Sequence, residues 1–165
     1  MASDPQPTRL SETNLSGEAS SGGTTTTRVV AAVLLAGLLP WSVQTFAGGE
    51  VFLRFAWGGV SFEPAFTVQL LWSYPLFAGP PILLQWATAS SCWLLALASA
   101  VAGRVRREDP RLTAGLLVLA GVANGLVAVE FGVQPTRTGS PTGTAAVFLV
   151  AGWRYWRALD SRCDD

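Results

Sequence analysis

Apolar and polar positions divide the chain into four apolar stretches separated by polar loops. The stretches are Val29–Ala47, Ile82–Gly103, Leu112–Val133 and Gly143–Trp156. Because a helix rises about 1.5 Å per residue and bilayer hydrocarbon is about 30 Å thick, the first three are long enough to cross it, whereas the fourth is marginal. Half of the residues are apolar and the mean hydropathy is +0.37. The pattern predicts an all-α membrane protein with four transmembrane helices.

The arginines near the ends of these stretches gather on one side of the predicted membrane. The inner group consists of Arg28, Arg104, Arg106, Arg107, Arg111, Arg154, Arg157 and Arg162. Only Arg54 and Arg137 fall on the other side. Since cytoplasmic loops are enriched in basic residues, we expect a multi-pass protein of the cell membrane with both termini in the cytoplasm.

The composition divides the chain into a membrane domain with two tails. Residues 1–28 are rich in Ser, Thr, Gly and Pro and nearly free of large apolar side chains. Such a segment cannot bury enough surface to offset the entropy of ordering it. We therefore predict a disordered cytoplasmic tail over 1–28, one four-helix transmembrane domain over 29–157, and a short cytoplasmic tail over 158–165.

The outer segment 48–81, between the first two predicted helices, is too long for a plain turn and rich in aromatic residues. Val51–Trp57 is β-prone, a Gly-Gly pair follows it, and Val60–Phe62 provides a return strand, which together predict a β-hairpin. Ala65–Phe77 is predicted to form an interfacial helix, with a short re-entrant helix as the alternative. We expect this segment to be ordered.

Polar residues also gather near the outer ends of the predicted helices. The candidate outer polar cluster is Glu130, Arg54, Arg137, Gln44 and Gln85. A carboxylate at membrane depth is costly unless it is paired or hydrated, so one hypothesis is an ion pair between Glu130 and either arginine. The alternative is that Glu130 reaches the water of the headgroup layer.

The third apolar stretch carries small residues at helical spacing, including a GxxxG pair. The candidate helix-packing face is Ala114, Gly121, Gly125, Ala128 and Gly132. Small residues let a second helix approach closely, so this face predicts a helix contact. Asn124 lies deeper and close to this face, where we expect it to form an interhelical hydrogen bond.

The residue types exclude several classes of enzyme. There is no histidine, which removes Ser-His and Cys-His nucleophile pairs, zinc-binding HExxH motifs and histidine haem ligands. The two cysteines, Cys92 and Cys163, are expected to lie too far apart for a disulfide. No catalytic arrangement is evident, and we expect no metal, no cofactor and no nucleic-acid partner.

Several short motifs together resemble a haloarchaeal family of small four-span membrane proteins. They are Leu39–Trp41, Phe55–Gly58, Arg111–Gly121, Pro141–Thr144 and Trp153–Trp156. The resemblance covers about residues 30–157 and departs at Trp86-Ala87, where the family pattern has Trp-Pro. That family has no assigned activity and is associated by gene neighbourhood with archaeosortase A. The resemblance implies a neighbour of that enzyme, since the enzyme itself needs a cysteine nucleophile with basic partners that include histidine.

These observations favour a non-enzymatic accessory or interaction partner of another membrane protein, with the archaeosortase system as the partner that the resemblance implies. The alternative is a lipid-binding or small-solute-binding or transport protein that uses an outer cleft around Glu130. An enzyme is the least favoured class. The partners we expect are the lipid bilayer and another integral membrane protein.

Overall fold

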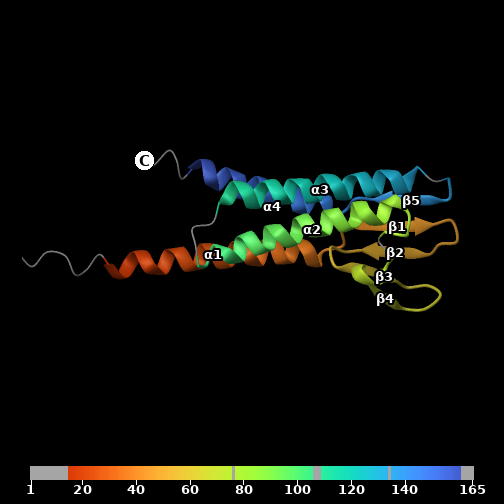
Figure 1. The fold of residues 1–165 in the computed structure, drawn as a ribbon, viewed down its shortest axis with the longest axis horizontal. Coiled ribbons are helices and arrows are strands. Elements are labelled where there is room, and N and C mark those ends of the chain that lie inside the picture. The colour runs from red at the N-terminus through yellow and green to blue at the C-terminus, as the bar shows by residue number, and fades with distance from the viewer. Residues whose placement is uncertain (1–14, 76, 106–108, 134, 161–165) are drawn as a thin grey trace, which may run out of the picture.

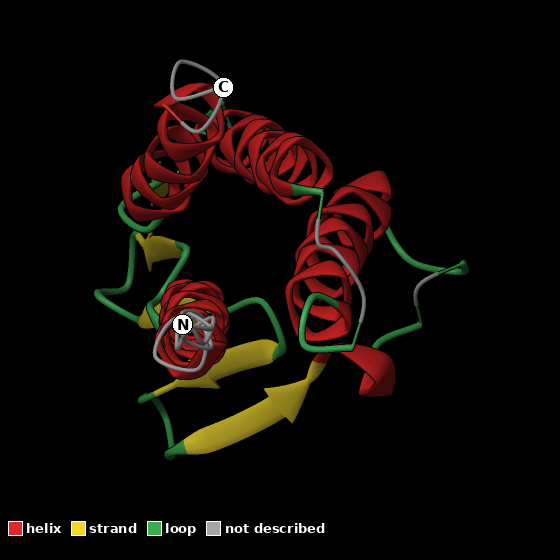
Figure 2. Cartoon of the chain, turned by 90° about the vertical axis from the view of Figure 1, so that its left-hand side faces the viewer, coloured by secondary structure: helices red, strands yellow, loops and turns green. Residues whose placement is uncertain are grey.

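The computed structural model describes residues 15–75, 77–105, 109–133 and 135–160, and in them four helices pack with a five-stranded sheet (Figure 1). The helices are α1 (Leu15–Leu38), α2 (Pro81–Ala102), α3 (Pro110–Gly132) and α4 (Thr144–Asp160). The strands are β1 (Ser42–Phe46), β2 (Val51–Arg54), β3 (Gly58–Ser61), β4 (Thr67–Leu70) and β5 (Arg137–Ser140), and a short 3₁₀ helix, η1, spans Leu71–Ser73. The helices run along the long axis of the molecule, and the sheet lies at one end (Figures 1 and 2).

The sheet is antiparallel throughout, with the strand order β4-β3-β2-β1-β5. The first four strands follow one another as a meander. β5 comes from the connection between α3 and α4 and pairs with β1, with Phe46 opposite Arg137. The sheet therefore ties the segment after α1 to the segment before α4, and β4 and β5 form its two edges.

Proline ends α1 partway along the bundle. Pro40 has no backbone donor and interrupts the helix, so the carbonyl of Ala36 lacks its helical partner. The indole nitrogen of Trp41 donates to this carbonyl at 2.8 Å. The indole of Trp93 on α2 donates to the carbonyl of Val33 at 2.8 Å, which ties α2 to α1. The chain then continues as β1 along the same axis.

The two longest apolar helices, α2 and α3, bury many small residues and expose many of their leucines, although Trp86, Trp93, Leu117, Val127 and Phe131 are buried too. Their buried small residues are Ala89, Ser90, Ala96, Ala100, Thr113, Ala114, Ala120, Gly121 and Ala128. Their exposed large residues include Leu84, Leu94, Leu95, Leu112, Leu119 and Leu126. A bundle in water is expected to show the reverse pattern, whereas close packing of small residues with leucines facing outward suits a lipid surrounding. By length and composition, α2 and α3 can cross a membrane.

The prediction of an all-α protein with four transmembrane helices is wrong. The structure contains a five-stranded antiparallel sheet, and within the described ranges only α2 and α3 are long and apolar enough to cross a membrane. The predicted first span, Val29–Ala47, changes from helix to strand after Leu38 because Pro40 interrupts it. α4 has 17 residues and rises about 25 Å, which is less than the thickness of the hydrocarbon.

The outer segment is ordered mainly as strands. β2 and β3 lie where the hairpin was predicted and pair Phe52 with Ser61. The predicted interfacial helix Ala65–Phe77 is not formed, since β4 pairs with β3 there and only η1 is helical. At the N-terminal side, α1 begins at Leu15, inside the predicted tail, and residues 1–14 and 161–165 lie outside the described residues.

Candidate functional site

A buried asparagine on α3 joins three other parts of the chain. Asn124 is 1% exposed, and its Oδ1 accepts a hydrogen bond from Nη2 of Arg54 on β2. Its Nδ2 donates to the carbonyl of Trp41 at 3.1 Å and to Oγ1 of Thr144 at 2.7 Å. One side chain therefore holds together the end of α1, the second strand and the start of α4.

Asn124 lies beside the point where α1 has ended and α4 begins. Trp41 follows the end of α1 and its carbonyl also accepts a hydrogen bond from the amide of Gly143, just before α4, at 3.1 Å. A side chain at Gly143 would overlap the carbonyl of Pro40, so only glycine allows the two segments to approach this closely. Interrupted backbone inside an apolar bundle needs such internal partners.

Arg54 is the buried charge of this region. It is 2% exposed, and its guanidinium lies 5.6 Å from the ring centre of Trp86 on α2, whose indole nitrogen in turn donates to the carbonyl of Phe55 at 2.9 Å. Among the described residues no carboxylate forms an ion pair with it. Burial lowers the pKa of Arg54 to about 10, so the guanidinium remains protonated at neutral pH.

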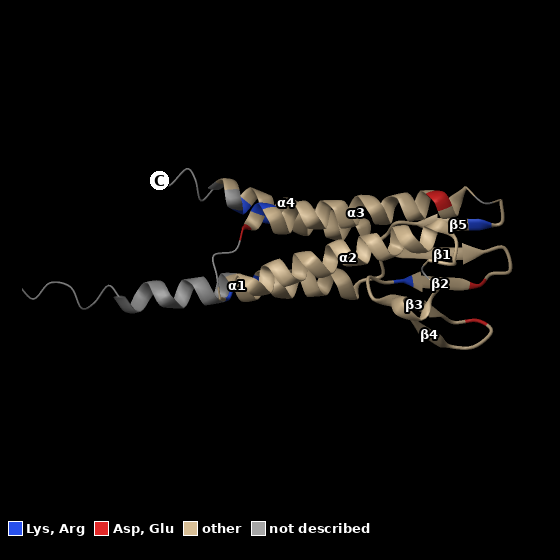
Figure 3. Cartoon of the chain, viewed as in Figure 1, with Lys and Arg blue, Asp and Glu red and all other residues tan. Residues whose placement is uncertain are grey.

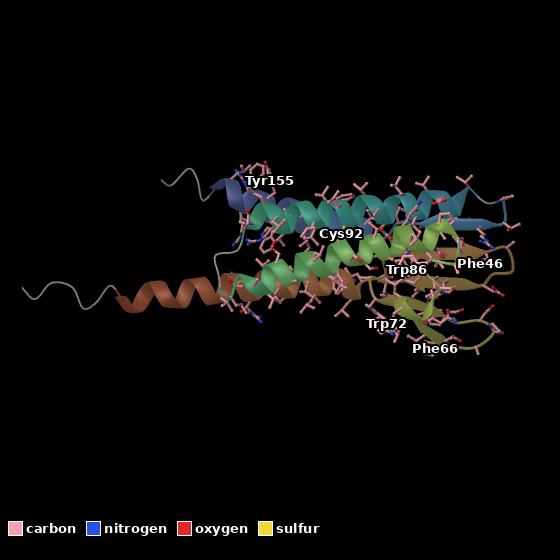
Figure 4. All side chains as sticks on the ribbon, viewed as in Figure 1. Phe46, Phe66, Trp72, Trp86, Cys92 and Tyr155 are labelled. Carbon is pink, nitrogen blue, oxygen red and sulfur yellow. The ribbon has the colours of Figure 1, made fainter. Side chains whose placement is uncertain are left out.

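A cavity of about 150 Å³ opens beside this guanidinium, between the sheet and the helices. Its wall is mostly apolar and aromatic, and Figure 4 shows Trp86 at this end of the bundle. Its lining residues are Gln44, Phe52, Arg54, Tyr74, Ile82, Leu83, Trp86 and Phe131. A tyrosine phenol is protonated at neutral pH and can donate a hydrogen bond, and burial raises the pKa of Tyr74 further. The cavity thus combines one fixed positive charge with an aromatic wall.

Several buried side-chain polar atoms have no hydrogen-bond partner in the described residues. They are Nε of Arg54, Oγ of Ser42, Oγ of Ser90, Nε1 of Trp57 and Oε1 of Gln85. Ser42 lies directly opposite Arg54 in the β1–β2 pair, so the two side chains leave the sheet on the same face. Ser90 lies one helical turn from Trp86 on α2. Buried polar atoms are nearly always paired. Of these residues only Arg54 lines the cavity, so the cavity meets one residue whose buried donor has no partner in the described residues.

The residues of the predicted outer polar cluster separate in the structure. Gln44 and Arg54 line the cavity together. Glu130 is exposed and forms no ion pair with Arg54 or Arg137, all of which are described. Gln85 lies one residue from Trp86, and its Oε1 is buried without a partner in the described residues. Only part of the cluster therefore contributes to one site.

Arg137 instead packs against aromatic rings at the edge of the sheet. Its guanidinium lies 5.3 Å from the ring centre of Phe46 and 5.4 Å from that of Phe131. These two rings meet edge to face, with their centres 5.5 Å apart. Since Arg137 is exposed, it provides a natural comparison for the buried Arg54.

The predicted helix-packing face is occupied within the chain. A methyl group at Gly121 would lie 2.9 Å from the ring of Phe148 on α4, and one at Gly139 on β5 would lie 2.7 Å from the carbonyl of Ala128. Ala114 is buried as well. Gly125 and Gly132 have no such close neighbour within the described residues. Gly121 therefore allows α4 to pack closely on α3, and Ala128 lies against β5.

Sequence reasoning missed most of the cavity wall and the partners of Asn124. Thr144 and Trp41 appeared only within motifs, and Tyr74 and Trp86 had no assigned role. The available signals were an asparagine inside an apolar helix and an arginine on the side with few basic residues. Both signals point to members of the network, but the sequence does not show that they meet.

Two further observations limit the chemistry of the described residues. No group of three His, Cys, Asp or Glu side chains in these residues is placed to hold a metal ion. Cys92 is a half-buried free thiol on α2 (Figure 4), and Cys163 lies outside the described residues. The site offers hydrogen-bond donors and a positive charge.

Comparison with known proteins assigns a family without assigning an activity. We find no match to the chain among curated proteins. A family model described as a domain of unknown function, DUF8050, matches residues 11–165, which is nearly the whole chain. The chain therefore belongs to the DUF8050 family of unknown function.

Proposed function

We propose that this protein is a non-enzymatic binding protein of the cell membrane that receives an anionic group at Arg54. The observation that carries the proposal is a guanidinium that is 2% exposed, has no carboxylate partner among the described residues and lines a cavity. The guanidinium contacts one amide oxygen and one aromatic ring but no opposite charge among the described residues, and a bound anion would lower the remaining cost of burying its charge. The proposal places the ligand at Arg54 and not at Glu130, because Glu130 is exposed.

In this proposal α2 and α3 cross the bilayer, and the end that is rich in arginine faces the cytoplasm. Figure 3 shows basic residues at the helix end remote from the sheet, which supports this orientation under the positive-inside rule. The sheet and the cavity then face outward. Labelling Cys163 with a membrane-impermeant thiol reagent in intact cells tests the orientation, and strong labelling would contradict it.

The size and wall of the cavity define the ligand chemistry. A volume of about 150 Å³ suits a carboxylate or phosphate group with a short apolar attachment. Arg54 supplies the charge, while Phe52 and Trp86 offer aromatic faces to the attachment. The anion can come from a lipid headgroup or from a free acid, and the two sources are separable by experiment.

Thermal unfolding of the full chain in mild detergent tests the proposal. Inorganic phosphate and acetate are compared with chloride at equal ionic strength. A ligand at about 100 times its Kd stabilises by about 2.7 kcal/mol, which for a chain of this size raises Tm by about 5–10 °C. Arg54→Gln is expected to abolish the increase, and Arg137→Gln, which removes an exposed arginine at the same end, is expected to retain it. Equal responses of both variants would overturn the proposal.

A second variant tests whether Arg54→Gln loses its response to anions only because it is misfolded. Asn124→Asp places a carboxylate against Arg54 and retains the acceptor, so the fold is kept while the charge is neutralised internally. We expect this variant to lose the response to anions. Purified protein analysed by lipid mass spectrometry distinguishes the ligand sources: retained phospholipid that disappears in Arg54→Gln indicates a headgroup, and a response to acetate alone indicates a free acid.

An interaction with another membrane protein is the second candidate function. The edge strand β4 is exposed along its length, and Phe66 and Trp72 beside it are 67% and 71% exposed (Figure 4). An open strand edge flanked by aromatic rings can accept a strand of a partner. The resemblance to the haloarchaeal family makes archaeosortase A the partner to test first.

Coexpression with archaeosortase A tests this second function. We expect copurification from membranes that is reduced by the double variant Phe66→Ser/Trp72→Ser and retained by Leu126→Ser, which alters an exposed leucine on α3. A wild-type protein that purifies alone would contradict the interaction. Because the anion test uses different variants, the two proposed functions can fail independently.

A further inference from the structure

A second, larger hollow lies at the opposite end of the bundle. It is a groove of about 700 Å³ between the first half of α3 and the last half of α4, and its wall is almost entirely carbon. Arg111 and Tyr155 stand at one end of it, and Gly115 and Gly152 form part of its floor. Figure 4 shows Tyr155 at the helix end remote from the sheet. This groove shares no residue with the cavity at Arg54.

The described part of the chain does not fill this groove. A methyl group built at Gly115 or at Gly152 meets no heavy atom within 4 Å. Leu112 and Leu119, which also line the groove, are 55% and 57% exposed. A concave apolar surface of this kind has the shape and polarity that suit an apolar ligand.

The polar end of the groove identifies the occupant. The guanidinium of Arg111 has no partner among the described residues, and the phenol of Tyr155 lies at the same end. Together they offer an anion several donors at the level where the basic residues gather (Figure 3). From Arg111 to Leu119 the groove follows about 12 Å of helix, the length of an extended hydrocarbon segment. A molecule with a phosphate at one end and a hydrocarbon chain at the other matches both features.

We propose that this groove binds an anionic phospholipid, with its hydrocarbon chain against Gly115 and Gly152 and its phosphate at Arg111 and Tyr155. The proposal rests on the membrane placement proposed above but not on the anion site at Arg54. Bilayer lipid is as apolar as the groove, so burial alone gives no preference for one lipid. The preference arises from the phosphate contact and from the fit of the chain.

Lipid binding to delipidated protein, followed by native mass spectrometry in detergent, tests this site. The probes are phosphatidylglycerol, which is anionic, and phosphatidylcholine, which has no net charge. We expect the first phosphatidylglycerol to bind about fivefold more tightly than phosphatidylcholine, the upper range for an exposed charge contact. Arg111→Gln is expected to reduce this preference to about one.

In a second measurement, lipid binding is compared in variants whose new side chains fill the groove. Gly115→Leu and Gly152→Leu place a side chain into open space, so they block the groove without disturbing the packing of α3 on α4. Both are expected to lose the first tightly bound lipid. Gly125→Leu is the matched control, because Gly125 also has open space beside it but does not line the groove.

Three outcomes would overturn the inference. They are unchanged binding in Gly152→Leu, an unchanged preference in Arg111→Gln, and a wild-type dimer that Gly152→Leu dissociates without altering lipid binding. The last outcome would assign the groove to a second copy of the chain. Recovery of the wild-type protein in the soluble fraction of cells would instead contradict the membrane placement, so failures of the two proposals are distinguishable.

Discussion

Replacement of Asn124 is the most informative perturbation of the buried network. In Asn124→Ala, Arg54 loses its hydrogen-bond acceptor and Thr144 loses the donor at 2.7 Å. The carbonyl of Trp41 keeps one partner, the amide of Gly143. A lost hydrogen bond to a charged group costs about 1.5–3 kcal/mol and a lost buried neutral one about 1–3 kcal/mol, so we expect a loss of about 3–5 kcal/mol.

That loss corresponds to a decrease in Tm of about 6–20 °C for a chain of this size. The measurement is thermal unfolding in mild detergent, followed by tryptophan fluorescence and checked by size-exclusion chromatography. Asn124→Asp loses the donated bonds but places a carboxylate against Arg54, so its expected decrease is at most about half as large. Leu126→Ala, at an exposed position on the same helix, is the control and is expected to change Tm by less than about 2 °C. The reasoning is refuted if Asn124→Ala is no more destabilised than this control.

Two further predictions concern helix packing and pH. A methyl group at Gly37 would overlap the indole of Trp93, whereas one at Gly115 meets open space, so we expect Gly37→Ala to be less stable than Gly115→Ala by about 2 kcal/mol in the same unfolding assay; equal stabilities would contradict the packing of α1 on α2. Because burial lowers the pKa of Arg54 to about 10, stabilisation by acetate is expected at pH 8 and is expected to weaken as the pH rises through about 10. A response that is unchanged at pH 11 would indicate that acetate binds at another arginine with an ordinary pKa.

The sequence allowed the two long apolar helices to be predicted, because hydrophobic length is a local property. The first predicted span was wrong after Leu38. Pro40 predicts a kink or an early break of the helix, and the helix does end there, but the apolar pattern continues beyond it into Val43 and Phe46. β1 pairs with β2, which follows it along the chain, and with β5, which lies far along the chain; no local pattern shows the second pairing. Pairing on both sides makes the outer part of the predicted span a strand of the sheet.

In the candidate site, too, the sequence pointed to single residues but did not show which of them meet. Composition identified Arg54 as unusual, since few basic residues lie on its side, and Asn124 as a polar residue within an apolar stretch. Their contact depends on β2 reaching α3, which is a consequence of the sheet. Glu130 drew attention as the nearby opposite charge, but it lies on the exposed side of α3, where water or headgroups can solvate it.

The charge of Arg54 is more than the network requires. Asn124 already satisfies Trp41 and Thr144 through its amide, and its Oδ1 needs only one neutral donor. Glutamine is about two bonds shorter than arginine, so Arg54→Gln gives up the hydrogen bond to Oδ1 of Asn124, which costs about 1–3 kcal/mol, and removes the desolvation cost of the guanidinium. Because the two effects oppose each other, without added anion we expect the Tm of Arg54→Gln to lie within about 5 °C of that of the wild type. A marked decrease in Tm under these conditions would show that the guanidinium is structural, and would remove the main argument that its charge is held for a ligand.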